Sequence, residues 1–272
     1  MRKRITIPRL SVNGVHIAYD TQGTGEPVVL VHGWCGARSI WRLQVPELAL
    51  SHRVIAVDLR GHGDSDKPHG SEHYSIGICA DDLNGLLEGL GIPSAVFMGQ
   101  SMGTLVCQQL SLAHPERVQA LILAGALAGS PPAGTIVGPW VERIVEEIEA
   151  KGLDEYLKTI VPFWFSPDFD PTAISSFTRD SFKAGQHAAV AFCRAVSGFS
   201  IRDKLSRIKV PTLIVVGERD GRTPVEEAES INRRIPDAWL KIIKSAGHMA
   251  NVEKPEEFNR AVRTFLDVAL RA

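Results

Sequence analysis

The sequence predicts an α/β fold: a mostly parallel, doubly wound sheet of about eight strands with an inserted helical cap. Short apolar runs recur along the 272-residue chain, helical stretches separate them, and this alternation stops over one internal segment. Uninterrupted apolar runs are typical of strands that are covered on both faces. Strands that alternate with helices are typical of βαβ units, whose right-handed crossovers place helices on both faces of a parallel sheet.

The predicted strands follow in order along the chain. The pair Asn13-Gly14 lies between two short extended segments and indicates a hairpin. The buried-strand runs that follow are "PVVLVHG" (27–33), "RVIAVDL" (53–59), "AVFMG" (95–99), "ALILAG" (120–125) and "PTLIVVG" (211–217). "WLKIIK" (239–244) is predicted as an edge strand.

Two helices of the core are marked by apolar spacing. Residues 76–90 place five aliphatic side chains near one face, namely Ile76, Leu83, Leu86, Leu87 and Leu90. The last helix opens at Pro255 with acidic residues in its first turn, which is typical of a helix N-terminus. Its apolar residues at helical spacing are Phe258, Val262, Phe265 and Leu266.

Residues 126–205 are predicted to form a helical cap. They contain no buried-strand run, but amphipathic stretches at 138–151 and 181–197 and ten of the 18 aromatic residues of the chain. The core is then made by residues 1–125 and 206–272. We expect the cap to cover the carboxyl edge of the sheet, with aromatic side chains lining an acyl pocket; the alternative is that they form only the cap's own core.

Composition excludes several classes of partner. The formal net charge of −1 argues against nucleic acid or an anionic membrane as a partner. No apolar run approaches the roughly 18 residues that cross a bilayer, and "MRKRITIPRL" lacks the apolar stretch of a signal peptide. The scattered cysteines predict neither a disulfide framework nor a zinc site. We expect a cytoplasmic protein without metal or organic cofactor; monomer and homo-oligomer both stay open.

Polar residues follow three of the predicted strands. Ligands of parallel sheets bind outside the carboxyl ends of the strands, and there the chain places Ser101, then Asp220, then His248. Ser101 lies between Gly99 and Gly103, directly after an apolar run and before a helical pattern. A very tight strand-to-helix turn would expose the serine and would leave no room for side chains at the two glycine positions.

These motifs resemble one family over essentially the whole chain. The matching pieces, in order, are "HGW" (32–34), "DLRGHGDSDKP" (58–68), "GQSMG" (99–103), "GERDGRTP" (217–224) and "AGHMANVEKP" (246–255). The chain resembles a capped, single-domain serine hydrolase of the α/β-hydrolase superfamily, similar to esterases, enol-lactonases and carbon–carbon hydrolases. A lone GxSxG would be a weak signal, but five pieces in order at strand ends are a strong one.

The resemblance implies a role for each matched residue. Ser101 would be the nucleophile, Asp220 the acid and His248 the general base of a catalytic triad, and the backbone N–H groups of Trp34 and Met102 would form the oxyanion hole. The chemistry agrees, because a serine hydroxyl needs a base and imidazole can act as one near neutral pH. A carboxylate would hold the other ring nitrogen, and each oxyanion donor is worth roughly 3 kcal/mol.

Several residues compete with these assignments. Some members of the family carry the acid after the strand at 120–125, but "AGALAGS" holds no carboxylate, which leaves Glu218 as a distant second to Asp220. His32 and His62 are expected to be structural residues of their turns. His187 is expected to be an exposed helical residue rather than a substrate contact.

Four further residues are candidates for substrate contact: Gln100, Trp140, Trp164 and Met249. Gln100 adjoins the nucleophile, and its side chain either faces the pocket or packs behind the sheet.

The predicted function is hydrolysis of a carboxylic ester or lactone of a small to medium apolar substrate through an acyl-enzyme intermediate. Ser101 argues against dehalogenases and epoxide hydrolases of this fold, which use an aspartate at the elbow. Thioesterases, carbon–carbon hydrolases of vinylogous diketones and cofactor-free perhydrolases stay open as alternatives. A small-molecule receptor that retains the triad is the alternative from another class.

Overall fold

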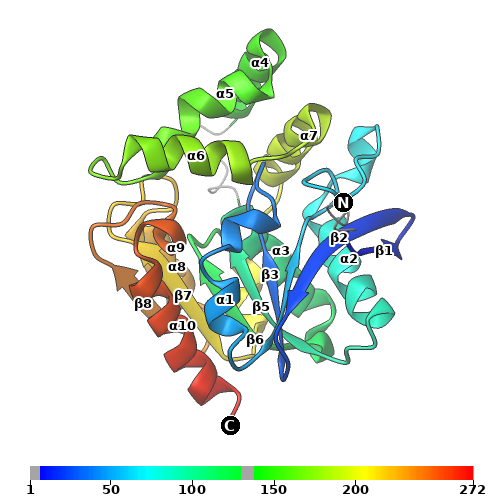
Figure 1. The fold of residues 1–272 in the computed structure, drawn as a ribbon, viewed down its shortest axis with the longest axis vertical. Helices are drawn as coiled ribbons and strands as arrows, with labels where there is room; N and C mark the ends of the chain where they lie inside the picture. The colour runs from blue at the N-terminus through cyan, green and yellow to red at the C-terminus, as the bar shows by residue number, and fades with distance from the viewer. Residues whose placement is uncertain (1–6, 130–137, 272) are drawn as a thin grey trace, which may run out of the picture.

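The computed structural model describes residues 7–129 and 138–271 and confirms the predicted fold class. An eight-stranded sheet has the order β1-β2-β4-β3-β5-β6-β7-β8 (Figure 1). Its strands are β1 (Arg9–Val12), β2 (Val15–Gln22), β3 (Pro27–Val31), β4 (Arg53–Val57), β5 (Ala95–Gln100), β6 (Val118–Ala124), β7 (Thr212–Gly217) and β8 (Trp239–Ile243). β1 and β2 pair antiparallel, β2 joins β4 antiparallel, and every pairing from β4 to β8 is parallel. β8 is an edge strand, as predicted.

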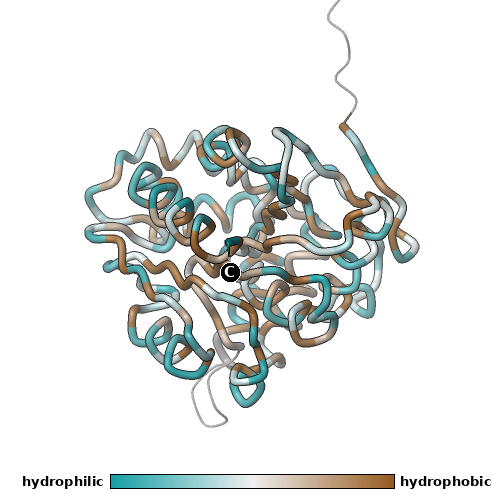
Figure 2. The backbone as a smooth tube through the Cα atoms, turned by 90° about the horizontal axis from the view of Figure 1, so that it is seen from below, coloured by the Kyte–Doolittle hydropathy of each residue, from teal (hydrophilic) through white to brown (hydrophobic). Residues whose placement is uncertain are grey.

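Helices cover both faces of the sheet. They are α1 (Val45–Leu48), α2 (Ile76–Gly89), α3 (Met102–Ala113), α4 (Gly138–Lys151), α5 (Leu153–Ile160), α6 (Pro171–Ser181), α7 (Gln186–Ser197), α8 (Val225–Asn232), α9 (Ala250–Glu253) and α10 (Pro255–Ala269). The outer helices alternate between hydrophilic and hydrophobic stretches in Figure 2, as expected for helices with one buried side. No helix within the described ranges is long and apolar enough to cross a bilayer.

Alternate residues of the central strands belong to two separate hydrophobic cores, one on each face of the sheet. In β5, for example, Phe97 packs with α2, α3 and α8 on one face, while Val96 and Met98 pack with α1 and α10 on the other. Successive side chains of a strand point to opposite faces, so a strand between two helical layers must be apolar throughout. This explains the uninterrupted apolar runs. β5 lies between β3 and β6 in the middle of the sheet, and its carboxyl end is therefore central.

Helices α4 to α7 lie together at one end of the molecule, above the sheet (Figure 1). α4 packs against α5 and α7, and apolar residues of α4, α5 and α6 join the core on the α10 face. No strand of the sheet falls within 138–205. The division into core and cap, at residues 126 and 205, stays a prediction.

One predicted helix begins later than its pattern suggests. The amphipathic stretch at 181–197 forms α7 only from Gln186, because the preceding residues run along the core. Phe182 bridges Gly36, and Ala184 bridges His62. The Lys183 N–H donates to the Cys35 carbonyl at 3.0 Å, and the Gly63 N–H donates to the Lys183 carbonyl at 2.8 Å. Backbone pairing of this kind competes with helix formation and prevails here.

Candidate active site

Ser101 occupies a strained turn between β5 and α3. Its backbone has φ 51° and ψ −120°, a region that non-glycine residues rarely adopt and that carries a cost of about 1–3 kcal/mol. The surrounding sheet holds this conformation, since the Ser101 N–H donates to the Ala124 carbonyl of β6 at 2.9 Å. The side chain is half-buried, in contrast to the fully buried strand that precedes it.

The two glycines around Ser101 are required by close backbone approach. A Cβ added to Gly99 would lie 2.5 Å from the Gly103 carbonyl oxygen. A Cβ added to Gly103 would lie 2.5 Å from the Val31 carbonyl oxygen and 2.6 Å from that of His32. Backbone atoms of a central sheet cannot move away cheaply, so no other residue fits at either position.

Asp220 and His248 form a buried pair. Asp220 follows β7 and His248 follows β8, and His248 Nδ1 lies 2.8 Å from Asp220 Oδ2. The Thr223 hydroxyl donates to the same carboxylate oxygen at 2.6 Å, and the Arg222 and Thr223 N–H groups donate to Oδ1 at 2.8 Å each. An ionised carboxylate only accepts hydrogen bonds, so the imidazole donates from Nδ1, and its Nε2 is the ring nitrogen that can take a proton.

The environment of Asp220 keeps it ionised. Burial by itself raises the pKa of this carboxyl, but the His248 imidazole and the Thr223 donors outweigh burial and lower the pKa below its ordinary value. Hydrogen bonds and positive charge favour the ionised form. The carboxylate can therefore stabilise a positive charge on His248.

The fold brings Ser101 and His248 to the same end of β6. Ser101 bonds to Ala124, the last residue of that strand. The next residue, Gly125, has φ 56°, and a Cβ there would lie 3.0 Å from His248 Cε1. Ser101, Asp220 and His248 thus lie at the carboxyl end of the sheet, after β5, β7 and β8.

The turn after β3 holds the Trp34 backbone in place. His32 Nε2 accepts from the Leu59 N–H at 3.0 Å, so its Nδ1 carries the proton and donates to the Gly33 carbonyl at 2.8 Å. Burial lowers the pKa of His32, which preserves this neutral form. His32 is therefore a structural residue, as predicted. The Trp34 indole donates to the Ala189 carbonyl of α7 at 2.9 Å and ties this turn to α7.

Met102 is the first residue of α3. The first N–H groups of a helix have no partner within the helix, and the helix dipole favours an anion near them. The Met102 N–H is therefore suited to bind an oxyanion beside Ser101.

The candidate substrate contacts differ in their positions. Gln100 is buried, donates to Met249 Sδ at 3.6 Å and packs against Gly33, so its side chain supports the turns on either side of Ser101. Met249 is also buried. Trp164 is buried and meets His248 edge-on, with ring centroids 6.3 Å apart. The side chain of Trp140, at the start of α4, lies outside the described residues.

His187 is not the exposed residue that the sequence predicts. It is half-buried, and its Nε2 lies 3.2 Å from the carbonyl oxygens of Lys67 and Pro68 and 3.3 Å from the Tyr74 hydroxyl. Its ring also stacks on His69. These contacts join α7 to the loop before α2, a long-range packing that helical periodicity could not reveal.

Sequence reasoning missed two residues that hold the triad. Thr223 contacts both Asp220 and His248, and it lies in the quoted motif "GERDGRTP". Glu253 is buried and accepts from the Gly247 N–H at 2.8 Å and from the Ser166 N–H at 2.9 Å. It joins the loop of His248 to the segment that carries Trp164. The motif position was a signal in both cases, but one partner of each residue, His248 for Thr223 and Ser166 for Glu253, is remote in sequence.

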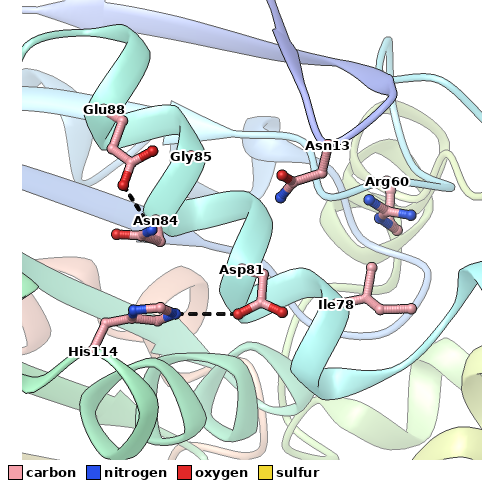
Figure 3. A pocket seen from close by; sticks show the side chains of 8 residues that line it. All are labelled: Asn13, Arg60, Ile78, Asp81, Asn84, Gly85, Glu88 and His114. Carbon is pink, nitrogen blue, oxygen red and sulfur yellow. Dashed lines mark hydrogen bonds and ion pairs between the residues drawn. The ribbon is translucent and has the colours of Figure 1, made fainter.

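A separate pocket of about 470 Å³ lies along α2, between the β1–β2 turn and the end of α3 (Figure 3). Its polar side chains are paired: His114 with Asp81 at 3.2 Å, Asn84 with Glu88 at 3.0 Å, and Arg60 with the buried Asp82. No triad residue lines it. Within residues 7–129 and 138–271, no group of three His, Cys, Asp or Glu side chains could hold a metal ion. The site at the strand ends is therefore the stronger candidate.

The chain is similar to known hydrolases in both sequence and structure. Residues 26–255 match the sequence profile of the alpha/beta hydrolase fold. The chain is 30% identical over 262 residues to 3-oxoadipate enol-lactonase 2 of Acinetobacter baylyi, covering 94% of this chain and 95% of the relative. It is 32% identical over 268 residues to 2-hydroxy-6-oxo-6-(2'-aminophenyl)hexa-2,4-dienoic acid hydrolase of Metapseudomonas resinovorans, covering 94% and 89%. An esterase structure from Thermogutta terrifontis matches with a TM-score of 0.87 at 29% identity, covering 97% of each chain.

The elbow geometry predicts a sharp steric effect. Gly103→Ala should destabilise the protein by about 3 kcal/mol, because the new methyl group meets backbone oxygens. Gly221→Ala is the matched control, since a Cβ there meets nothing within 4 Å, and we expect a change within about 0.5 kcal/mol. Urea unfolding measures both. Equal stability of the two variants would contradict the close approach at Gly103.

Proposed function

The chain belongs to the alpha/beta hydrolase family, and we propose that it is a serine hydrolase that cleaves a carboxylic ester or lactone of a small to medium, largely apolar substrate through an acyl-enzyme intermediate. The observation that carries the proposal is the strained, half-buried Ser101 after β5, at the same end of β6 as a buried Asp220–His248 pair. A serine in a strained backbone conformation at the carboxyl end of a central strand is typical of a nucleophile.

In the proposed acylation step, His248 Nε2 takes the proton from the Ser101 hydroxyl as Oγ attacks the substrate carbonyl carbon. The carbonyl oxygen becomes negative and is bound by the N–H groups of Trp34 and Met102, each worth about 3 kcal/mol. Asp220 stabilises the imidazolium. The C–O bond to the leaving group then breaks, and His248 returns its proton to the leaving oxygen.

Deacylation repeats the sequence with water. His248 accepts a proton from water, the resulting hydroxide attacks the acyl carbon, and the bond to Ser101 Oγ breaks as that oxygen regains its proton. The net reaction adds one water across the ester. In a lactone the leaving oxygen stays attached to the product as a hydroxyl group.

Carbon–carbon bond hydrolysis is the second candidate, favoured by the relative from Metapseudomonas resinovorans. The same serine, histidine and oxyanion donors could serve it, with a carbon leaving group in place of oxygen. A panel of esters, lactones and vinylogous diketones would separate the two functions by their kcat/KM values.

The nucleophile can be identified by labelling. A phosphonate that mimics the tetrahedral intermediate should modify one serine, and mass spectrometry should locate it on the peptide containing "GQSMG". Ser101→Ala should abolish labelling and lower kcat by on the order of 10⁴- to 10⁶-fold. Full turnover by this variant would contradict the assignment. A receptor with an inert triad would bind ligand in both forms and release no product.

The pH dependence should report the Asp220–His248 pair. kcat/KM should rise with pH through one ionisation, because only the neutral imidazole can take the Ser101 proton. The lowered pKa of Asp220 keeps the carboxylate charged throughout this range. Asp220→Asn should lower kcat by on the order of 10⁴-fold, since the imidazolium loses its negative partner.

The control for this measurement is Glu218→Gln. Glu218 is the other acid after β7, but it is exposed and accepts from the Ser245 N–H at 2.9 Å instead. We expect Glu218→Gln to show the same kcat and the same dependence of kcat/KM on pH as the wild-type protein. A larger loss in Glu218→Gln than in Asp220→Asn would reverse the assignment of the acid.

Trp164 should govern substrate size if helices α4 to α7 act as a cap. Trp164→Ala should change kcat/KM for long-chain 4-nitrophenyl esters more than for the acetate ester, because the indole lies beside His248. Trp239→Ala, on the edge strand β8, is the matched control and should leave the chain-length profile as it is. A loss of stability with an unaltered profile would make Trp164 only a core residue.

A further inference from the structure

We propose that Glu253 is a positioning residue for the hydrolysis, an inference that rests on the proposed function. Its carboxylate holds the backbone beside His248 and the backbone beside Trp164 as one unit. Turnover would then depend on a side chain that touches neither the substrate nor the reacting atoms. The two segments concerned are residues 164–166, before α6, and residues 247–249, after β8.

Glu253 joins these segments through its two carboxylate oxygens. Oε1 accepts from the Gly247 N–H at 2.8 Å, and Oε2 accepts from the Ser166 N–H at 2.9 Å. The residue is only 8% exposed, so water competes little for either bond. Hydrogen bonds to a carboxylate are charge-assisted and roughly twice as strong as bonds between neutral groups. The carboxylate therefore fixes the separation of Gly247 and Ser166.

The same segments also touch directly along their backbones. The Met249 N–H donates to the Trp164 carbonyl at 3.2 Å. A Cβ added to Gly247 would lie 2.7 Å from the Ser166 nitrogen and 2.9 Å from the Trp164 carbonyl oxygen. The missing side chain at Gly247 thus allows the two backbones to approach. These contacts flank His248 on both sides, since they involve the residue before it and the residue after it.

The position of the His248 ring depends on this backbone. Asp220 holds Nδ1 of the ring at 2.8 Å, and the Trp164 ring meets the imidazole edge-on with centroids 6.3 Å apart. Trp164 and the His248 backbone thus share one support, the carboxylate of Glu253. A displacement of about 1 Å at a reacting group costs on the order of 100-fold in rate. A side chain that fixes this backbone can therefore control the rate from outside the triad.

The chemistry of the contact requires a carboxylate. Both partners of Glu253 are N–H donors, so the side chain must offer an acceptor atom to each. Glutamine has nearly the same shape but offers one acceptor oxygen, and its NH₂ group would meet the second N–H donor to donor. Glu253→Gln therefore breaks one of the two bonds without removing side-chain volume.

The test compares chemistry with binding in Glu253→Gln. The variant should lower kcat for 4-nitrophenyl acetate by on the order of 10- to 100-fold and change KM by less than about 3-fold, because the base is misaligned while the pocket is kept. Phosphonate labelling of Ser101 should slow by a similar factor, since it uses the same histidine. Both are measured where circular dichroism shows folded protein. Wild-type kcat and labelling in the folded variant, with only Tm lowered, would overturn the proposal.

Glu218→Gln is the matched control. It makes the same substitution at the other end of the His248 loop, where Glu218 accepts from the Ser245 N–H at 2.9 Å. Glu218 is exposed, so water can replace its single bond to this loop. We expect kcat and the labelling rate to keep their wild-type values. An equal loss in both variants would show that any change in the loop is sufficient, which would contradict a specific role of Glu253.

Amide hydrogen exchange tests the contact in the wild-type protein, without a variant that has to fold. Because one carboxylate binds both amides, the Gly247 and Ser166 hydrogens should exchange through a common opening, at intrinsic-rate-corrected rates within about 10-fold of each other by NMR. A larger difference would overturn the proposal. If the wild-type protein cleaves no ester and the phosphonate labels no serine, the proposed function fails separately, and the exchange rates still report on the Glu253 contact.

Discussion

The close packing of backbone at the end of β5 is the constraint on which the rest of the site depends. Gly103 lies so near the carbonyl groups of Val31 and His32 that α3 begins directly against the end of β3. This contact forces the chain to turn within one residue. Ser101 makes the turn by adopting a positive φ. The strain is retained because two neighbouring strands and a buried helix fix the turn from all sides.

Three long-range connections join the loops at the carboxyl end of the sheet to the segment that contains the helices above it. Residues 182–185 pair with the loops after β3 and β4, the Trp34 indole binds the carbonyl of Ala189, and Glu253 ties the His248 loop to Ser166. Each connection reaches a loop that holds a proposed catalytic group or its neighbour. The segment that carries helices α4 to α7 therefore contacts the loops that hold the proposed site.

Asp220 and His32 are buried ionisable residues near the proposed site. Asp220 has a lowered pKa despite its burial, because imidazole, hydroxyl and amide groups surround it. His32, in contrast, is kept neutral, because burial lowers the pKa of its imidazole. The neutral ring bridges two backbone groups, the Leu59 N–H and the Gly33 carbonyl. Two histidines of one site thus have different tasks, which their hydrogen-bond partners decide.

The sequence by itself determined the layered fold, the elbow and the positions of Ser101, Asp220 and His248, because strand periodicity and glycine spacing are local and strand ends meet at one edge. Only the tertiary structure decided what these residues touch. It placed Gln100 between two turns, turned His187 inward and brought Arg222 over Trp164. Such contacts join segments far apart in the chain, and their geometry depends on how the helices pack, which no local pattern encodes.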